Sequence, residues 1–159
     1  FALAVEVNLT AAFHLARLVA PGMIERQQGS IVNITSVHGL VASAPNRQAG
    51  YVASKTGLVG LTRELACQWA VAGVRVNAIA PGYFATELTD EMIATDSGRE
   101  WIERNTPMRR VGAEDELDGA LLFLASDAST YVTGQTIAVD ACRNADTAAR
   151  RRSRQERGT

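Results

Sequence analysis

The chain has 159 residues, 47% of them hydrophobic and 21% charged, and a formal net charge of −1. This length and composition suit one globular domain, which excludes a disordered protein, and the near-zero charge indicates neither an acidic nor a basic partner. Two cysteines, Cys67 and Cys142, lie far apart without a CxxC spacing. They therefore predict no zinc site and no disulfide framework, and they favour a reduced protein of the cytoplasm.

An amphipathic helix is predicted over residues 3–26, because apolar side chains recur there at three- and four-residue steps. Pro21 is expected to bend or end this helix near its last turn. Polar residues such as Glu6 and Arg17 interrupt the stretch, so we predict no membrane span, and a signal peptide would need a basic start. A chain that opens inside a helix is expected to lack its beginning.

Helices and short β-branched strands alternate along the rest of the chain. The runs "SIVNIT", "VRVNAIA" and "QTIAVD" are bounded by turn residues and predict buried strands. Gly73 is placed to end the helix before the second strand. The order predicts an α/β protein with a parallel sheet and right-handed crossovers. The predicted strands and helices are, in chain order, 30–35, 49–72, 74–80, 88–95, 98–104, 114–126 and 135–140.

The last residues differ in charge from the body. Residues 143–159 hold six arginines against two acidic residues, whereas the preceding residues hold ten basic and fifteen acidic ones. This stretch shows no apolar periodicity, so we predict one domain over residues 1–142 followed by a disordered tail. The arginines could contact phosphates, but the tail carries no aromatic residue, and a solvated extension without a nucleic-acid partner is favoured.

Candidate chemistry lies where the predicted strands end, because ligands of open parallel sheets bind beyond the carboxyl ends of the strands. Ser36 follows the first strand, and Pro81 and Gly82 follow the second. The helix between these strands begins with Tyr51 and Lys55. We expect all of these residues to face the same edge of the sheet.

Lys55 is the only lysine among sixteen basic residues, and it lies four residues after Tyr51. That spacing places both side chains on one helix face. A phenol loses its proton only near pH 10, so a neighbouring cation is needed before it can exchange protons near neutral pH. A compact ammonium on a slim stem suits this role better than the broad guanidinium of arginine.

Four segments in this order resemble the short-chain dehydrogenase/reductase family: "NITSVHG", "YVASKTGLVGLTRELA", "GVRVNAIAPGYFAT" and "FLASDASTYVTGQTIAVD". The likeness extends from about Val7 to Asp140. It implies a Rossmann-like doubly wound parallel sheet, of which the chain would hold the last three strands and their helices. It also implies hydride transfer between NAD or NADP and a small carbonyl or alcohol substrate.

The same resemblance implies roles for individual residues. Tyr51 matches the general acid/base of the family, and Ser36 matches the hydroxyl that binds the same substrate oxygen. Lys55 matches the residue that binds the ribose hydroxyls of the nicotinamide nucleotide and assists the tyrosine. Asn8 matches a helix asparagine that helps to hold a proton-relay water. No metal ligand is implied.

A second set of residues would surround the nicotinamide and the substrate. The resemblance implies that the Phe84 backbone and the Thr86 hydroxyl meet the carboxamide. His38 and Tyr83 fall where the family often lines its substrate pocket, although simple packing explains them equally well. The stretch expected to lie against the nicotinamide comprises Pro81, Gly82, Phe84 and Thr86.

The chain departs from the family pattern in three places. No G-x-G-x-x-G phosphate loop occurs in the sequence. The expected ending "VDGG" reads Val139, Asp140, Ala141 and Cys142. The loop between Ser36 and Tyr51 is slightly long, and it could shape substrate choice. We therefore expect one edge of the first strand to lack a partner and the isolated chain to bind dinucleotide poorly.

Two functions stay open from the sequence. The first is part of an NAD(P)-dependent oxidoreductase for a small carbonyl, polyol, sugar-acid, steroid-like or acyl-thioester substrate. Within the family, "APGYFATEL" leans slightly toward the branches that act on sugar acids and 3-oxoacyl thioesters. The second is an inactive remnant that serves at most as an oligomerisation or binding module. The helices that carry Asn8 and Tyr51 commonly form dimer and tetramer contacts in the family, which implies a homo-oligomer. Trp69, Trp101 and Tyr131 are interpreted as core or interface aromatics.

Overall fold

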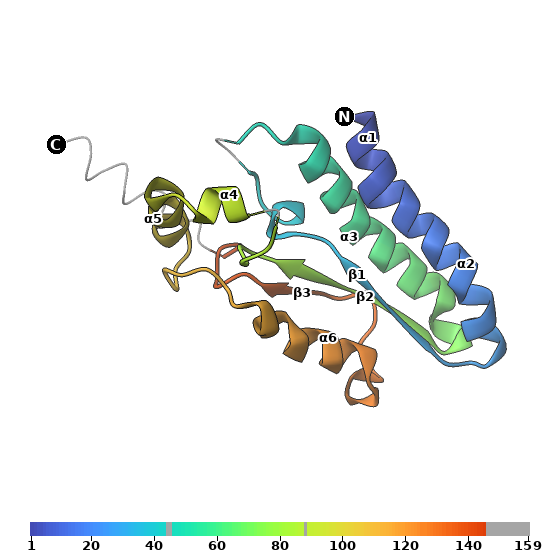
Figure 1. The fold of residues 1–159 in the computed structure, drawn as a ribbon. Helices are drawn as coiled ribbons and strands as arrows, with labels where there is room; N and C mark the ends of the chain where they lie inside the picture. Colours follow the sequence, from blue (N-terminus) through green and yellow to red (C-terminus); the bar gives the residue numbers. More distant parts are fainter. Residues whose placement is uncertain (44–45, 88, 146–159) are drawn as a thin grey trace.

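The computed structural model describes residues 1–43, 46–87 and 89–145. Its centre is a three-stranded parallel sheet in the order β1-β2-β3 (Figure 1). The strands are β1 (Gly29–Ile34), β2 (Val74–Pro81) and β3 (Thr136–Val139). Both strand pairs are parallel. The α/β class and the three predicted strands are therefore confirmed.

Helices cover the two faces of this sheet. One face carries α2 (Ala11–Glu25) and α3 (Ala49–Trp69), and the other carries α6 (Asp118–Ala125) (Figure 1). The Ser30 hydroxyl at the start of β1 donates to the Leu124 carbonyl of α6 over 2.8 Å. This layering results from parallel strands, because each crossover returns its helix to one face of the sheet.

The first helical stretch runs from α1 (Ala2–Val5) through a π-helical segment (Glu6–Thr10) into α2. Pro21 lies inside α2 and does not end it, because the helix continues to Glu25. Over its most apolar 18 residues the stretch has a mean hydropathy of 1.3, so length and composition alone would allow it to cross a membrane. Here α2 contacts β1 and α3, although only 6% of that apolar stretch is buried by the described residues.

Helix α3 ends where the sequence predicted. After Trp69 a short 3₁₀ turn spans Ala70–Ala72, and Gly73 follows with a φ of 72°. A Cβ atom at Gly73 would lie 2.2 Å from the Gln27 carbonyl oxygen, so the close approach as well as the positive φ requires glycine. This turn leads directly into β2.

The core lies between β2 and the helices α2 and α3. Its central cluster comprises Ala16, Leu65, Ala66 and Val76, each at most 4% exposed. Phe13, Ile31, Leu61 and Trp69 pack against this cluster. Trp69 is therefore a core aromatic, as predicted, whereas Tyr131 is fully exposed and the core interpretation is wrong for it. Trp101 lies elsewhere, beside the site described below.

The outer edge of β1 has no partner strand in the described part of the chain, as the sequence predicted. Ile34 at the end of β1 is 50% exposed. Large apolar side chains are also exposed on α1, the π-helical segment, α2 and α6: Leu3, Val7, Leu15, Leu18, Val19, Ile24, Leu121, Leu122 and Phe123. The described residues thus leave apolar side chains uncovered on both sides of the sheet (Figure 1).

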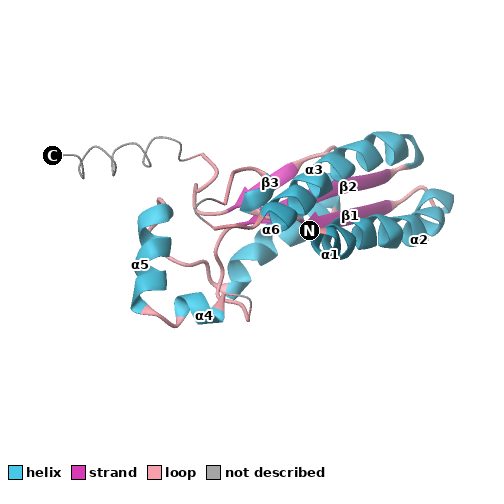
Figure 2. Ribbon diagram, turned by 90° about the horizontal axis from the view of Figure 1, so that it is seen from above, coloured by secondary structure: helices cyan, strands magenta, loops and turns pink. Residues whose placement is uncertain are grey.

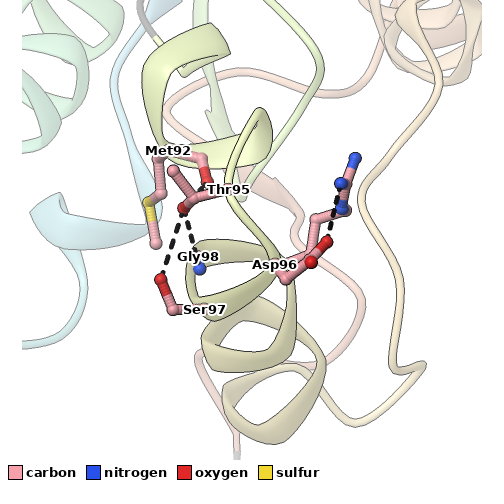
Figure 3. Close-up of polar contacts among 6 residues, drawn as sticks. Met92, Thr95, Asp96, Ser97 and Gly98 are labelled. Carbon is pink, nitrogen blue, oxygen red and sulfur yellow. Dashed lines mark hydrogen bonds and ion pairs between the residues drawn. The ribbon is translucent and has the colours of Figure 1, made fainter.

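Two short helices, α4 (Asp90–Ile93) and α5 (Asp96–Asn105), extend from the carboxyl end of the sheet (Figure 2). They meet at a tight corner. The Thr95 hydroxyl donates to the Met92 carbonyl over 3.2 Å and accepts from the Gly98 amide over 3.1 Å (Figure 3). A Cβ atom at Gly98 would lie 1.9 Å from the Met92 oxygen, so the corner excludes any larger residue.

After β3 the chain turns sharply. Ala141 and Cys142 both adopt positive φ angles, 53° and 71°, where the family pattern predicts two glycines. Arg143 follows and is 5% exposed. The tail predicted over 143–159 thus begins with an ordered, buried side chain, and residues 146–159 lie outside the described residues.

Candidate active site

A cleft of about 550 Å³ lies at the carboxyl end of the sheet. It is lined by Ser36 and His38 after β1, by Tyr51 at the start of α3, and by Gly82 and Tyr83 after β2. Thr89 and Met92 line it from the side of α4. The structure therefore brings five of the predicted site residues into one cleft, at the edge of the sheet that the strand order indicated.

Tyr51 and Lys55 lie one turn apart on α3 and contact each other. The Lys55 ammonium nitrogen is 5.8 Å from the centroid of the Tyr51 ring. It also donates to the Ile34 carbonyl at the end of β1 over 3.0 Å. Burial lowers the pKa of the Lys55 ammonium below its ordinary value, because a low-dielectric environment disfavours the charged form.

The loop after β1 is held against α3 close to Lys55. The Thr35 hydroxyl donates to the Lys55 carbonyl over 2.8 Å, and a Cβ atom at Gly39 would lie 2.9 Å from the same carbonyl oxygen. This packing fixes the position of Ser36 relative to α3. The Ser36 hydroxyl accepts from the His38 amide over 3.1 Å, and its own proton can be donated to a second oxygen.

The rings of His38 and Tyr83 form one wall of the cleft, and the Trp101 ring packs behind Tyr83. The His38 Nε2 and Tyr83 Oη atoms are 3.3 Å apart, and their rings meet edge to face at 6.2 Å between centroids. The Tyr83 ring meets the Trp101 ring of α5 in the same way at 5.6 Å. His38 and Tyr83 thus line the cleft, and Trp101, which we had interpreted as a core or interface aromatic, supports them from behind.

Asn8 lies in the middle of the π-helical segment. Its side-chain amide donates to the Ser54 hydroxyl over 3.2 Å, and that hydroxyl donates to the Tyr51 carbonyl over 2.8 Å. Asn8 and Lys55 also line a common cavity of about 310 Å³ along the open edge of β1. Single π turns inside helices are frequent at functional sites, and here the π turn carries a predicted site residue.

The segment after β2 contributes only part of its predicted residues to the cleft. Pro81 ends β2, and Gly82 approaches β3 so closely that a Cβ atom would lie 2.7 Å from the Asp140 Cα atom. Phe84 is buried and Thr86 is exposed, and neither lines the cleft.

Thr89 is the residue that the sequence reasoning missed in this segment. Its hydroxyl donates to the Phe84 carbonyl over 2.5 Å and accepts from the Thr86 amide over 3.0 Å. It also lies 3.2 Å from the Thr86 hydroxyl, so it engages both groups that the family resemblance assigns to the carboxamide, the Phe84 backbone and the Thr86 hydroxyl. The signal was present in the sequence, since a threonine three residues after Thr86 is placed to bond back to the backbone of its own turn.

The donors in this region suit the nicotinamide end of a dinucleotide. Within the described part of the chain Lys55 makes one hydrogen bond, to Ile34, and an ammonium has two further donors for ribose hydroxyls. Tyr51 lies beside it on the same face. For the phosphates, by contrast, the sequence offers no glycine-rich loop. Among the described residues no cluster of three or more His, Cys, Asp or Glu side chains could hold a metal ion.

Fold and site together define an α/β protein with a parallel sheet and a tyrosine–lysine pair at the carboxyl end of its strands. A family model described as enoyl-(acyl carrier protein) reductase matches residues 1–142. The chain belongs to the short-chain dehydrogenase/reductase family.

Relatives of known activity cover most of this chain. Galactitol 2-dehydrogenase (L-tagatose-forming) of Cereibacter sphaeroides is 45% identical over 135 residues, which are 84% of this chain and 53% of that protein. The 3-oxoacyl-acyl-carrier-protein reductase FabG of Thermotoga maritima is 40% identical over 136 residues, which are 86% of this chain and 54% of that protein.

Solved structures give the same result. Gluconate 5-dehydrogenase from Burkholderia cenocepacia, in complex with NADP and tartrate, has a TM-score of 0.84 and 40% identity to this chain. The likeness covers 89% of this chain and 55% of that one. The chain thus spans about half the length of the relatives it matches.

Proposed function

We propose that the chain supplies the proton-transfer and substrate-binding part of an NAD(P)-dependent oxidoreductase that interconverts an alcohol and a carbonyl group. The observation that carries this proposal is the single cleft lined by Ser36 and Tyr51, with the Lys55 ammonium 5.8 Å from the Tyr51 ring. The nicotinamide, when bound, accepts or supplies the hydride.

The residues of this chain would handle the proton and the substrate oxygen. Tyr51 would donate its phenolic proton to a carbonyl oxygen, or remove the proton of an alcohol in the reverse direction. The Ser36 hydroxyl would donate a hydrogen bond to the same oxygen. The Lys55 ammonium would hold the ribose hydroxyls beside Tyr51, while Asn8 supports the start of α3 through Ser54.

For the substrate we favour a polyol or sugar acid over a 3-oxoacyl thioester. The described residues that line the cleft include Arg47, Gln48 and Asn46 from the long loop after β1, and they include no acidic side chain. Such a lining offers many hydrogen-bond partners to hydroxyl groups and one cation to a carboxylate. The names of the relatives include both substrate classes, so the preference rests on this lining.

The proposal is tested by supplying the part of a relative that this chain does not span. The 159-residue chain would be co-expressed with the amino-terminal half of the galactitol 2-dehydrogenase relative, and oxidation of NADH and NADPH would be followed with polyol, sugar-acid and thioester substrates. We expect turnover from the pair and none from either part alone. Micromolar or tighter binding of NAD(P)H to the isolated chain would contradict the proposed division of the cofactor site.

A second candidate, an oligomerisation module without catalysis, is supported by the uncovered apolar surface of the π-helical segment and α2, where Val7, Leu15 and Leu18 are each more than 60% exposed. Helices of this kind bury their apolar faces against a partner. We therefore propose a homo-oligomer for either candidate function. We also propose that the protein acts in the cytoplasm and has no nucleic-acid partner. Sedimentation of the chain with and without Leu18→Glu checks this, since the substitution should produce a monomer.

A further inference from the structure

Arg143 is the first residue beyond the stretch that the family model matches, so the family likeness assigns it no role. The turn that carries it is held by Asp140, whose carboxylate accepts from the Cys142 amide over 3.0 Å and from the Asn144 amide over 2.6 Å. Ala141 and Cys142 adopt positive φ angles to make this turn. Its result is that the Arg143 side chain points inward and is 5% exposed.

The guanidinium of Arg143 contacts the segment after β2 and helix α5 at the back of the cleft wall. Its central carbon lies 5.1 Å from the centroid of the Tyr83 ring after β2 and 5.4 Å from the centroid of the Trp101 ring on α5. Its Nη1 donates to the Asn105 carbonyl at the end of α5 over 2.9 Å. A planar guanidinium can stack on aromatic faces and bond a carbonyl at the same time, which the ammonium of lysine cannot match.

We propose that Arg143 is a positioning residue that sets the substrate-facing wall of the cleft. By holding the Tyr83 ring against Trp101, it keeps the Tyr83 hydroxyl at hydrogen-bonding distance from His38. His38 and Tyr83 both line the cleft. Its bond to the Asn105 carbonyl also ties it to α5, the helix that carries Trp101. Arg143 acts through Tyr83 and does not itself line the cleft. The inference rests on the proposed function for its catalytic consequence, but not for its structural one.

The structural consequence can be measured on the 159-residue chain alone. In a Trp69→Phe background Trp101 is the only tryptophan, so its fluorescence reports the stack directly. We would compare Arg143→Met and Arg143→Lys with Arg63→Met, a control at an exposed position on α3. Arg143→Met should increase acrylamide quenching of Trp101 and shift the NMR signals of the His38 and Tyr83 rings. Arg143→Lys should give a smaller change, and Arg63→Met none.

The catalytic consequence is measured in the reconstituted enzyme. Arg143→Met should raise KM about fivefold, which corresponds to the ~1 kcal/mol of one cation–π contact, and should leave kcat unchanged because Tyr51 and Lys55 are untouched. A parallel fall in kcat, or an unchanged KM, would overturn the positioning role. If reconstitution yields no activity even with Arg143 present, the proposed function fails and the spectroscopic result alone decides.

Unaltered His38 and Tyr83 signals in a folded Arg143→Met chain would also overturn the inference, since a residue that only anchors the end of the chain leaves the wall intact. Should Arg143→Met fail to fold, Arg143→Lys provides the same comparison, because it keeps the buried charge while losing the flat stack.

Discussion

The two sides of the cleft are built in different ways. On one side Tyr51 and Lys55 share a helix face, and Ser36 follows a strand that packs on that helix, so short-range rules place all three residues. On the other side Tyr83, Trp101 and Arg143 come from three elements far apart in the sequence. The first side keeps the family pattern, whereas the second includes a residue beyond it. Under the proposed function, proton transfer and substrate choice would therefore depend on separable parts of the structure.

The largest expected effect is on the first side. Tyr51→Phe removes the proton donor and should lower turnover of the reconstituted enzyme by roughly 10²- to 10⁴-fold. The substitution keeps the ring beside Lys55, so thermal unfolding of the chain should not change. A variant that retained normal turnover would show that another group transfers the proton.

On the second side, the α4–α5 corner should be sensitive to a single methyl group. Gly98→Ala places a Cβ atom where the Met92 oxygen lies, and we expect a loss of roughly 1 to 3 kcal/mol in the free energy of unfolding. The matched control is Gly60→Ala on α3, where a Cβ atom meets nothing within 4 Å. This control should stabilise the chain by up to about 1 kcal/mol, because alanine favours helix. Urea titration distinguishes the two results, and an equal response of both variants would contradict the tight corner.

The turn that leads to Arg143 should gain stability from glycine. Ala141 has a φ of 53°, and the left-handed region costs a residue with a Cβ atom roughly 1 kcal/mol or more. Ala141→Gly should therefore raise the free energy of unfolding by about 1 kcal/mol, less the added freedom of the unfolded chain. Urea titration checks this. Destabilisation would mean that the methyl group of Ala141 packs in a way that outweighs the strain.

The smallest expected effect is on the stability of the chain at low pH. Hydrogen bonds from the Arg110 side chain and from the Ala113 amide lower the pKa of Glu116 to about 2 from an ordinary value of 4.5. Because the folded-state pKa is the lower one, this contribution to stability is complete above about pH 4.5 and disappears as the pH falls toward 2. Glu116→Gln should be less sensitive to pH across that window. Identical acid unfolding curves would rule out the contribution.

Much of the fold could be predicted from sequence because the rules that place its elements are local. The β-branched runs gave all three strands, and Gly73 gave the end of α3, since only glycine fits there. Pro21 does not end α2, because a proline in the last turns of a helix can be tolerated when the helix is held by packing.

The site could be predicted only in part. Tyr51, Lys55 and Ser36 follow from helix spacing and strand ends, whereas no spacing rule connects Tyr83 to Trp101 or to Arg143. The interpretation of Arg143 as the first residue of a tail came from composition, which describes averages and cannot anticipate a guanidinium stacked on two rings. Thr89 was overlooked because the resemblance directed attention to Thr86.

The π-helical segment at Glu6–Thr10 has a geometric consequence for the whole first helix. One additional residue in a turn rotates everything that precedes it by about 100° relative to an unbroken α-helix. The first helical stretch can thus bury Ala16 and Ala20 and still place Phe1 and Ala4 in the lining of the cleft. Deleting one residue from this segment would therefore rotate α1 away from the cleft while α2 kept its packing on the sheet.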